Sequence, residues 1–326
     1  MARSLKIGTF NVQNLFFRYE MLDKTRNGMK VVPVDPDRLT INDFRRILER
    51  SGPIGEAERL ATAQVILAND PDVVALQEVE NIEILDAFNR QYLKRRYPYS
   101  MVVDGNDPRQ IDVGILSRHD IVAVRSRRWE PKGSAPTKRI FSRDCLAATV
   151  DAGGFRLTMY VNHFKSKLPT RYPDGTIDDG RAKRKRQADR VAAILAEDFP
   201  DGRGHYVVAG DLNAGPTESA LRQLVTQAGL ENVVDRLPAA ARWTHYYARE
   251  KVGPKQKQID YLLLSPDLSA RTQGILPVIE RRGLDPKIVR KVNTAPKAFG
   301  GPIDPFEGVG TGASDHCGVF LSIPLD

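Results

Sequence analysis

The pattern of apolar and polar residues at the start of the chain predicts a strand–helix–strand unit. Residues 5–12 and 73–76 are apolar-rich runs of the length of a strand. Between them, residues 56–68 carry apolar side chains at helical spacing, namely Leu60, Ala61, Ile66 and Leu67. A strand, an amphipathic helix and a second strand are therefore expected in this order.

The rest of the chain continues this alternation in two halves of similar rhythm. Helices are predicted at residues 82–93 and, with a strongly basic sequence, at about 180–198. Short strand-like runs, separated by Gly, Pro and Asp, occupy residues 100–103, 112–116, 121–125, 145–150, 156–161, 206–209, 259–264 and 318–323. Strands with helices spaced between them favour a layered α/β sandwich, in which helices flank two packed sheets.

Two long stretches interrupt the pattern, at residues 18–55 and 273–313. Both exceed the usual length of a connection, so we interpret them as functional insertions on the rim of a site. The second stretch is rich in Pro and Gly and is expected to be irregular and mobile. No linker divides the chain, and we predict a single domain over residues 1–326.

Composition narrows the class of protein. The chain has 326 residues, of which 41% are hydrophobic, as in globular proteins. Its net charge of +8 favours a polyanionic partner, although a basic surface can also serve solubility alone. The two cysteines fit neither a metal finger nor a disulfide framework. No apolar run would span a bilayer and no signal sequence is evident, so we expect a cytoplasmic protein without an obligate protein partner.

Polar residues with chemical potential lie at the ends of the predicted strands. They are Asn11, Glu78 in LQEVEN, His163 in TMYVNHFKSK, Asp211 and Asn213 in GDLNAGP, Asp260 in QIDYLLLS, and Asp315 with His316 in GASDHCGVFLSI. A strand end holds a side chain in fixed geometry while the following loop leaves it reachable. This placement predicts a site built at one edge of the sheets.

The residue types favour a hard metal ion and proton chemistry. Mg²⁺ takes one or two carboxylates and keeps several waters, a demand that Glu78, Asp315 and Asn11 fit, so we predict Mg²⁺ or Mn²⁺. A histidine acts as acid or base when a carboxylate orients it, which favours His316 with Asp260 as its orienting partner. Taken alone, His163 is interpreted as a structural histidine. The polar residues taken together, in this order along the chain, favour a functional site.

That ordered set resembles the endonuclease/exonuclease/phosphatase family, which has the deoxyribonuclease I-like fold, along nearly the full chain. The matching segments, in family order, are TFNVQNLF, DVVALQEVEN, IDVGILSR, YVNHFKSK, VVAGDLNAGP, QIDYLLLS and SDHCGVFLSI. NHFKSK and IDVG are most similar to a bacterial nuclease-like branch whose members are often secreted. The resemblance implies a four-layered α/β sandwich with two mixed sheets, and hydrolysis of a phosphate ester by in-line attack of water.

The resemblance also implies roles for the residues. Asn11, Glu78 and Asp315 would surround the metal, Asp211 would align or deprotonate the attacking water, and Asn213 would contact phosphate. His316, oriented by Asp260, would contact the scissile phosphate or act as the base, and His163 would face its other side. Asp112 is expected to orient His163 as a second histidine–carboxylate pair.

Basic residues near these segments are candidates for binding phosphate. Lys165 and Lys167 lie on the same side of an extended chain, and we expect them to cradle phosphates together with Arg109 and Arg143. The segment RAKRKRQADR, residues 181–190, would bind a polyanion along a helix face if that face borders the site. A solvated helix face is the alternative interpretation.

Three functions remain open at this point. A metal-dependent phosphodiesterase acting on DNA or RNA, such as an endonuclease, is favoured by the net charge and the basic helix. The same catalytic set would serve an inositol-phosphate phosphatase or a sphingomyelinase-like phospholipid esterase, because a fold does not fix a substrate. A catalytically inactive binding module is disfavoured, because every acid and histidine of the set is present.

Overall fold

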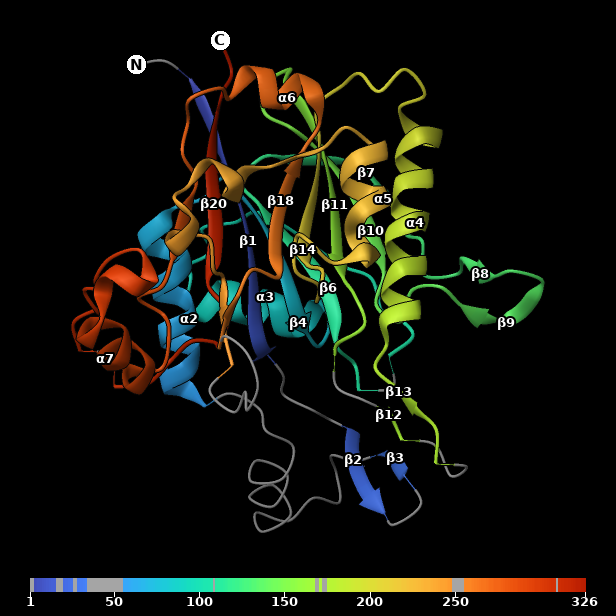
Figure 1. The fold of residues 1–326 in the computed structure, drawn as a ribbon, viewed down its shortest axis with the longest axis horizontal. Helices are drawn as coiled ribbons and strands as arrows, with labels where there is room; N and C mark the ends of the chain where they lie inside the picture. The colour runs from blue at the N-terminus through green and yellow to red at the C-terminus, as the bar shows by residue number, and fades with distance from the viewer. Residues whose placement is uncertain are drawn as a thin grey trace.

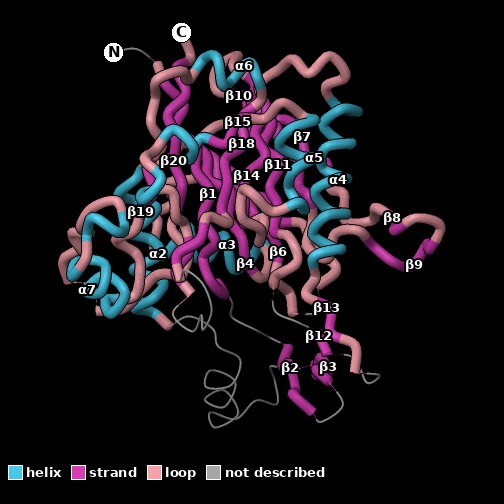
Figure 2. The backbone as a smooth tube through the Cα atoms, viewed as in Figure 1, coloured by secondary structure: helices cyan, strands magenta, loops and turns pink. Residues whose placement is uncertain are grey.

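The computed structural model describes residues 3–15, 20–25, 28–33, 55–107, 109–167, 170–171, 175–247, 255–308 and 310–326. Two six-stranded sheets pack face to face, and helices cover the outer face of each sheet (Figure 1, Figure 2). The predicted four-layered α/β sandwich is therefore confirmed. No helix in the described part of the chain is long and apolar enough to cross a membrane.

The first sheet joins strands from both ends of the chain. Its order is β19 (Val278–Glu280), β20 (Gly318–Pro324), β1 (Ser4–Leu15), β4 (Val73–Val79), β6 (Asp112–Ser117) and β5 (Tyr99–Val102). β1 pairs in parallel with β4, and the other neighbouring pairs are antiparallel. The sheet is mixed, as predicted.

The second sheet is built from the middle of the chain. Its order is β15 (Glu231–Asn232), β18 (Asp260–Leu264), β14 (Tyr206–Asp211), β11 (Arg156–His163), β10 (Cys145–Asp151) and β7 (Asp120–Arg125). β11 and β14 are parallel and the remaining pairs are antiparallel. Each sheet thus contains one parallel pair near its centre.

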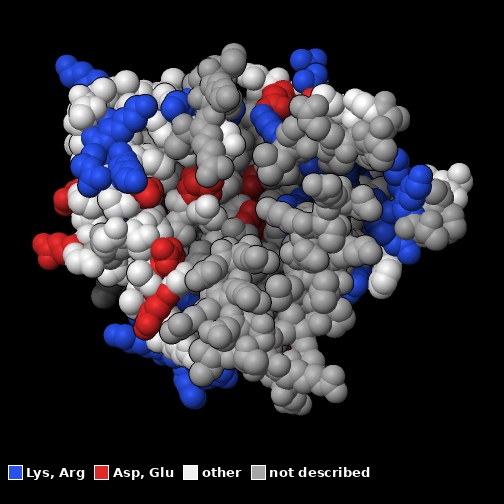
Figure 3. Space-filling model, turned by 90° about the horizontal axis from the view of Figure 1, so that it is seen from below, with Lys and Arg blue, Asp and Glu red and all other residues white. Residues whose placement is uncertain are grey.

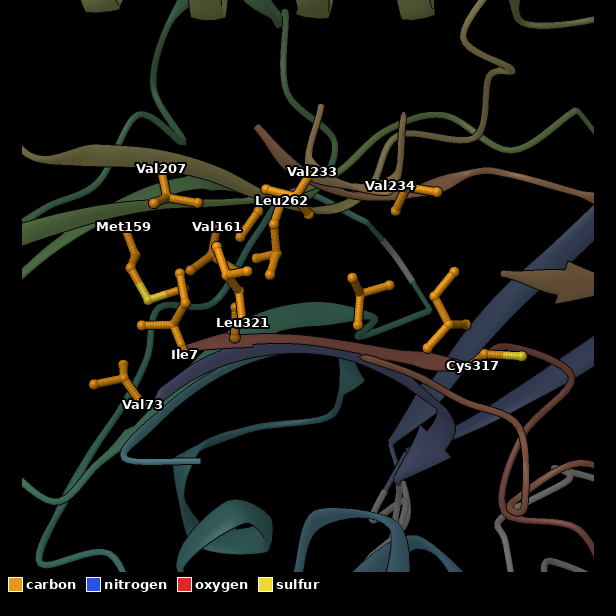
Figure 4. Close-up of a cluster of buried hydrophobic side chains, with 14 of the residues drawn as sticks. Ile7, Val73, Met159, Val161, Val207, Val233, Val234, Leu262, Cys317 and Leu321 are labelled. Atoms are coloured by element: carbon orange, nitrogen blue, oxygen red, sulfur yellow. The ribbon is translucent and has the colours of Figure 1, made fainter. Parts of the chain in front are cut away.

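Three apolar layers hold the sandwich together. Ile7, Val73, Met159, Val207 and Leu262 belong to the layer between the two sheets (Figure 4). A second layer packs the second sheet against α4 (Arg181–Asp198) and α5 (Ser219–Gln227), and a third packs the first sheet against α2 (Glu56–Asn69) and α3 (Ile82–Gln91). Central strands buried on both faces are apolar at nearly every position.

The two long stretches differ in what the structure describes. Residues 273–313 are not irregular, because they contain β19, the helix α7 (Pro286–Thr294) and a 3-10 helix η4 (Pro296–Phe299). Val289 and Val292 of α7 are buried against the central apolar layer, which explains why a Pro-rich segment is ordered. In the first stretch, β2 (Glu20–Thr25) and β3 (Gly28–Pro33) form a hairpin, and residues 34–54 lie outside the described part.

Several shorter hairpins and helices lie outside the two main sheets. They are hairpins of β8 (Pro131–Lys132) with β9 (Ala135–Arg139), β12 (Thr170–Arg171) with β13 (Ile177–Asp178) and β16 (His245–Tyr246) with β17 (Gln256–Lys257), the 3-10 helices η2 (Val233–Arg236) and η3 (Ala239–Ala241), and the helix α6 (Pro266–Arg271). The β8–β9 hairpin projects from the body beside α4 (Figure 1).

Candidate active site

The period of two along the strands places four polar residues on the inner faces of the sheets. In β1, Leu5 and Ile7 face the central layer, and continuing the alternation brings Asn11 to the same face. In the second sheet the register pairs His163 with Asp211 and Asp211 with Asp260. The site therefore lies where these strands leave the apolar layer, between the two sheets.

Glu78 reaches this site because a bulge interrupts β4. Gln77 pairs with Val113 and Val79 with Asp112, so Glu78 is an extra residue in the strand. Its φ of 66° lies in the left-handed region, which is unusual for a residue with a side chain. A bulge of this kind redirects a side chain, and strained backbone of this kind concentrates at functional positions.

Asn11 joins the carboxylates of the two sheets. Its Nδ2 donates to Oε1 of Glu78 at 3.2 Å and to Oδ2 of Asp211 at 3.2 Å. Its Oδ1 accepts a hydrogen bond from the backbone N of Gln13 at 3.0 Å. In this orientation the amide turns donors, and not its oxygen, toward the carboxylates. Asn11 would have to rotate its amide to act as the metal ligand that the sequence predicts.

Asp211 is a deeply buried acid of the site. Oδ1 accepts from the backbone N of Asn213 at 2.8 Å, and Oδ2 accepts from Nδ2 of Asn213 at 3.0 Å. Burial raises the pKa of Asp211 to about 7, although the charge of His316 opposes the rise. Nδ2 of Asn213 also donates to the carbonyl of Phe164 at 3.1 Å, so Asn213 holds Asp211 in place.

The turn that delivers Asp211 depends on a glycine. Gly210 has a φ of 134°, and a Cβ at this position would lie 1.9 Å from the carbonyl oxygen of Asn162 on β11. A residue with a side chain would separate the parallel pair β11–β14, so this position requires glycine.

His316 forms the predicted pair with Asp260. Its Nδ1 lies 3.0 Å from both carboxylate oxygens of Asp260, and Thr244 donates a further hydrogen bond to that carboxylate at 2.7 Å. Nε2 of His316 is left facing Asp211 and Asp315, each at 3.8 Å. Burial opposes the charged ring, but Asp260 and Asp211 together raise the pKa of His316 well above its usual value.

His163 occupies the opposite side of Asp211 and is electrostatically different. Its Nε2 lies 3.5 Å from Oδ2 of Asp211 and 4.0 Å from Oε1 of Glu78. Burial and then the charge of Arg143 lower its pKa well below the usual value, so this imidazole is neutral. The site thus combines one histidine that favours a proton with one that does not.

The predicted pairing of His163 with Asp112 is wrong. Nδ1 of His163 is buried and has no hydrogen-bond partner among the described residues. Asp112 turns instead toward the loop after β5, where its Oδ1 accepts from the backbone N of Gly105 at 2.8 Å. The order of the motifs along the chain does not reveal the direction of the Asp112 side chain. The loop at residues 104–107 determines it.

A third histidine, His245, completes the rim and was missed by the sequence analysis. Its Nε2 lies 3.5 Å from Oδ2 of Asp315, and its ring centroid is 4.6 Å from that of His316. An isolated β-bridge between His245 and His316 brings the two together. Its only sequence signal is a position shortly before the strand that carries Asp260, which does not predict a bridge.

The predicted phosphate-binding arginines are partly engaged by a residue that the sequence analysis did not select. Arg109 donates from Nε and Nη2 to Asp107, each at 3.0 Å. Nε of Arg143 lies 3.1 Å from the same carboxylate, and its Nη1 donates to the carbonyl of Phe164 at 3.1 Å. Burial lowers the pKa of Arg143, while nearby acids, Glu78 among them, oppose this effect. Arg143 therefore places its charge beside the site.

Lys165 and Lys167 lie beyond the end of β11. β11 ends at His163, so the alternation expected of an extended chain does not reach them. Lys165 is half-buried, and burial together with the charges of Arg143 and Arg109 lowers its pKa. Lys167 instead pairs with Glu218 just before α5. That the two lysines cradle phosphates together stays a prediction.

The basic helix α4 is also less uniform than predicted. Arg184 is only 2% exposed, and its Nη1 donates to the carbonyls of Lys165, Ser166 and Asp179 at 3.0–3.2 Å. This arginine fastens α4 to the loop that follows β11 and does not form part of a solvated cationic face. Lys185 pairs with Asp189 on the same helix.

The residues present fit a hard divalent cation. The carboxylates of Glu78 and Asp315 are both accessible, with 19% and 36% of their side-chain surface exposed. Ligand atoms of His245, Asp315 and His316 lie within 4.8 Å of one another, as do those of Asp211, Asp260 and His316. Carboxylate oxygens such as those of Glu78 and Asp315 suit Mg²⁺ or Mn²⁺.

Comparison with known structures finds the same fold in other proteins. Truncated TDP2 from Caenorhabditis elegans superposes with a TM-score of 0.59 at 15% identity, covering 98% of this chain and 97% of that chain. The catalytic domain of human nocturnin with bound sulfate superposes with a TM-score of 0.58 at 14% identity, covering 99% of this chain and 94% of that chain. Sphingomyelinase C from Streptomyces griseocarneus superposes with a TM-score of 0.57 at 16% identity, covering 98% of this chain and 99% of that chain. At these identities the likeness concerns the fold alone.

The fold and the site together define a hydrolase of the deoxyribonuclease I-like class. More particularly, the chain belongs to the Endonuclease/Exonuclease/phosphatase family, whose model matches residues 8–316. No curated protein matches the chain.

Proposed function

We propose that the protein is a divalent-metal-dependent phosphodiesterase that cleaves the backbone of nucleic acid by in-line attack of water. The observation that carries the proposal is the arrangement around Asp211. This buried carboxyl lies between a neutral histidine, His163, and a histidine that favours the charged form, His316. Two groups with opposite proton preferences on either side of an acid suit proton transfer to and from a phosphate ester.

Each residue of the site would have its own role in the hydrolysis. Asp211, held by Asn11 and Asn213, would align the attacking water and accept its proton. His316 would donate from Nε2 to a phosphoryl oxygen, because Asp260 fixes its Nδ1 and stabilises its positive charge. Arg143 and His163 would face the other phosphoryl oxygens.

Glu78 and Asp315 would hold the metal ion, with Asn11 joining them after rotation of its amide. Such an ion, when bound, neutralises charge that develops on the phosphoryl and leaving oxygens. His245, which contacts Asp315 from the rim, would keep that carboxylate oriented.

The proposed substrate class rests on charge. The chain carries a net charge of +8, and Arg143 places a buried positive charge beside Glu78 and Asp211. A nucleic acid presents many phosphates that such positive charge can neutralise, whereas a single lipid headgroup presents few. A phospholipid or inositol-phosphate esterase is the competing function on the same fold.

The test is hydrolysis by the purified protein of plasmid, single-stranded DNA, RNA, sphingomyelin and a phosphoinositide, with and without Mg²⁺ or Mn²⁺. We expect metal-dependent cleavage of nucleic acid, and a loss of about 10³-fold or more in Glu78→Gln and Asp211→Asn. Glu83→Gln on α3 makes the same charge change on the outer layer and is the matched control. Calorimetric titration with Mn²⁺ should show weaker binding to Glu78→Gln. Cleavage of sphingomyelin or phosphoinositide alone would refute the proposed substrate.

A further inference from the structure

Trp129 is exposed in a way that hydrophobic burial does not explain. Its side chain is 62% exposed, although it lies directly before the β8–β9 hairpin in an ordered turn. The guanidinium groups of Arg128 and Arg139 lie 4.6 and 5.2 Å from the centre of its ring. Single exposed hydrophobic residues are common, so the indole alone indicates no ligand. The hydrogen bonds of its turn and the cations on neighbouring elements do point to a ligand.

The turn that carries Trp129 is fastened to the loop beside the active site. Nη2 of Arg128 donates to the carbonyl of Gly105 at 3.4 Å, and Nδ2 of Asn106 donates to the carbonyl of Arg128 at 2.7 Å. The next residue, Asp107, binds Arg109 and lies 3.1 Å from Arg143, whose charge acts on the catalytic acids. The turn that carries the indole is therefore fixed to the loop that contacts Arg143.

Three cations lie on the elements next to Trp129, namely Lys132 on β8 and Lys183 and Arg186 on α4. Arg190 of α4 donates to Glu130, the residue after Trp129, at 2.9 and 3.1 Å, so α4 packs against this turn. Burial and then the charge of Arg143 lower the pKa of Lys183; the acid Asp107 opposes this, and the charges of Arg186 and Lys132 add to it. Within the described part of the chain, no ion pair joins Lys132, Lys183 or Arg186 to an acid, whereas Lys185 on the same helix pairs with Asp189. Lys and Arg side chains gather where the hairpin projects (Figure 3).

We propose that Trp129, Lys132, Lys183 and Arg186 form a binding site for single-stranded nucleic acid adjoining the catalytic site. A base of the strand stacks on the indole, and the three cations neutralise neighbouring phosphates. A duplex does not expose the faces of its bases, so this site selects an unpaired strand. The inference rests on the proposed nuclease function and goes beyond it in naming the form of the substrate.

The number of tryptophans makes the test direct. The chain has two, and the other, Trp243, is 4% exposed, with Nε1 donating to the carbonyl of Phe299. Stacking of a base on Trp129 should quench the exposed fluorescence when a 12-nucleotide single strand is added in EDTA, where no hydrolysis occurs. Trp129→Leu should abolish the quenching and weaken binding measured by anisotropy about 5- to 100-fold. A duplex of the same sequence should quench little.

Matched variants separate this surface from general effects. Lys183→Glu should weaken binding and reduce its dependence on salt, whereas Lys185→Glu, with the same charge change on a residue already paired, should have little effect. Leu276→Ala removes another exposed hydrophobic side chain, between α6 and β19, and should change neither quenching nor affinity. Hydrolysis of bis(p-nitrophenyl) phosphate should be the same in Trp129→Leu and wild type, because that diester carries no further nucleotide to occupy the proposed site.

Each outcome discriminates between the two proposals. If single-stranded DNA is cleaved and bound equally well by Trp129→Leu and wild type, the stacking site is refuted while the nuclease function stands. If no oligonucleotide is bound or cleaved but sphingomyelin is, the proposed function itself fails. If phosphatidylcholine–phosphatidylserine vesicles change the Trp129 fluorescence and oligonucleotides do not, the surface contacts membranes and the inference is overturned.

Discussion

Asp112 provides a quantitative test of how the loop at residues 104–107 is built. The carboxyl is 3% exposed and accepts a hydrogen bond from the backbone N of Gly105. Burial, followed by the neighbouring charges of Asp104 and Asp107, raises the pKa of Asp112 to about 7. An asparagine keeps the acceptor oxygen for Gly105 but carries no titrating proton. Asp112→Asn therefore isolates the cost of the buried charge.

The size of the effect follows from linkage. The pKa rises from 3.8 to about 7, and each pKa unit corresponds to about 1.36 kcal/mol, so the full span is about 4 kcal/mol. The stability that the neutral carboxyl contributes is complete below pH 3.8 and is lost as the pH rises through 7. Between pH 5 and pH 8, wild type should lose about 2.5 kcal/mol relative to Asp112→Asn, with no further change above pH 8.

Urea denaturation of both proteins at pH 5, 6, 7 and 8 measures this difference. Asp201→Asn is the matched control, because Asp201 also accepts a backbone hydrogen bond, from Arg203, but lies on the surface. The control should show a difference in unfolding free energy that hardly depends on pH. If the gap between Asp112→Asn and wild type is equally independent of pH, Asp112 is charged in the folded protein and the reasoning is refuted.

Three further predictions address the site and its scaffold. Asp260→Asn should lower kcat by about 10³- to 10⁴-fold, and adding His316→Ala should lower it little further, because the two act as one unit; steady-state kinetics on the four proteins decides this. Gly210→Ala should reduce the free energy of unfolding by about 3–5 kcal/mol through backbone strain and a clash with the neighbouring strand, measured by urea denaturation. Arg184→Ala should cost about 2–4 kcal/mol by leaving buried carbonyls unpaired, and Lys185→Ala less than about 1 kcal/mol, in thermal or urea melts.

The parts of the site that follow from strand periodicity could be predicted from sequence. Asn11 lies within β1 and Asp211 ends β14, and the period of two then determines which face they occupy. The pairing of His316 with Asp260 followed from residue type and order. These features depend on local patterns that a single sequence carries.

Other features depend on contacts between loops, which a sequence does not encode locally. His245 reaches the site through a bridge to a residue 71 positions later, since 316 − 245 = 71. Asp112 faces a loop amide instead of His163, and Arg184 is buried although it lies in a run of basic residues. The bulge at Glu78 is likewise a property of strand pairing, because only its partner strand shows that a residue is extra.

The placement of β20 has a consequence for synthesis of the protein on the ribosome. This strand lies next to β1 in the first sheet, yet its residues are translated after all the other strands. Asp315 and His316 directly precede it, so a nascent chain or a prematurely terminated product can contain Asn11, Glu78 and Asp211 and still lack the last histidine and the strand that positions it. A chain truncated before β20 is therefore expected to lack any activity that depends on this set.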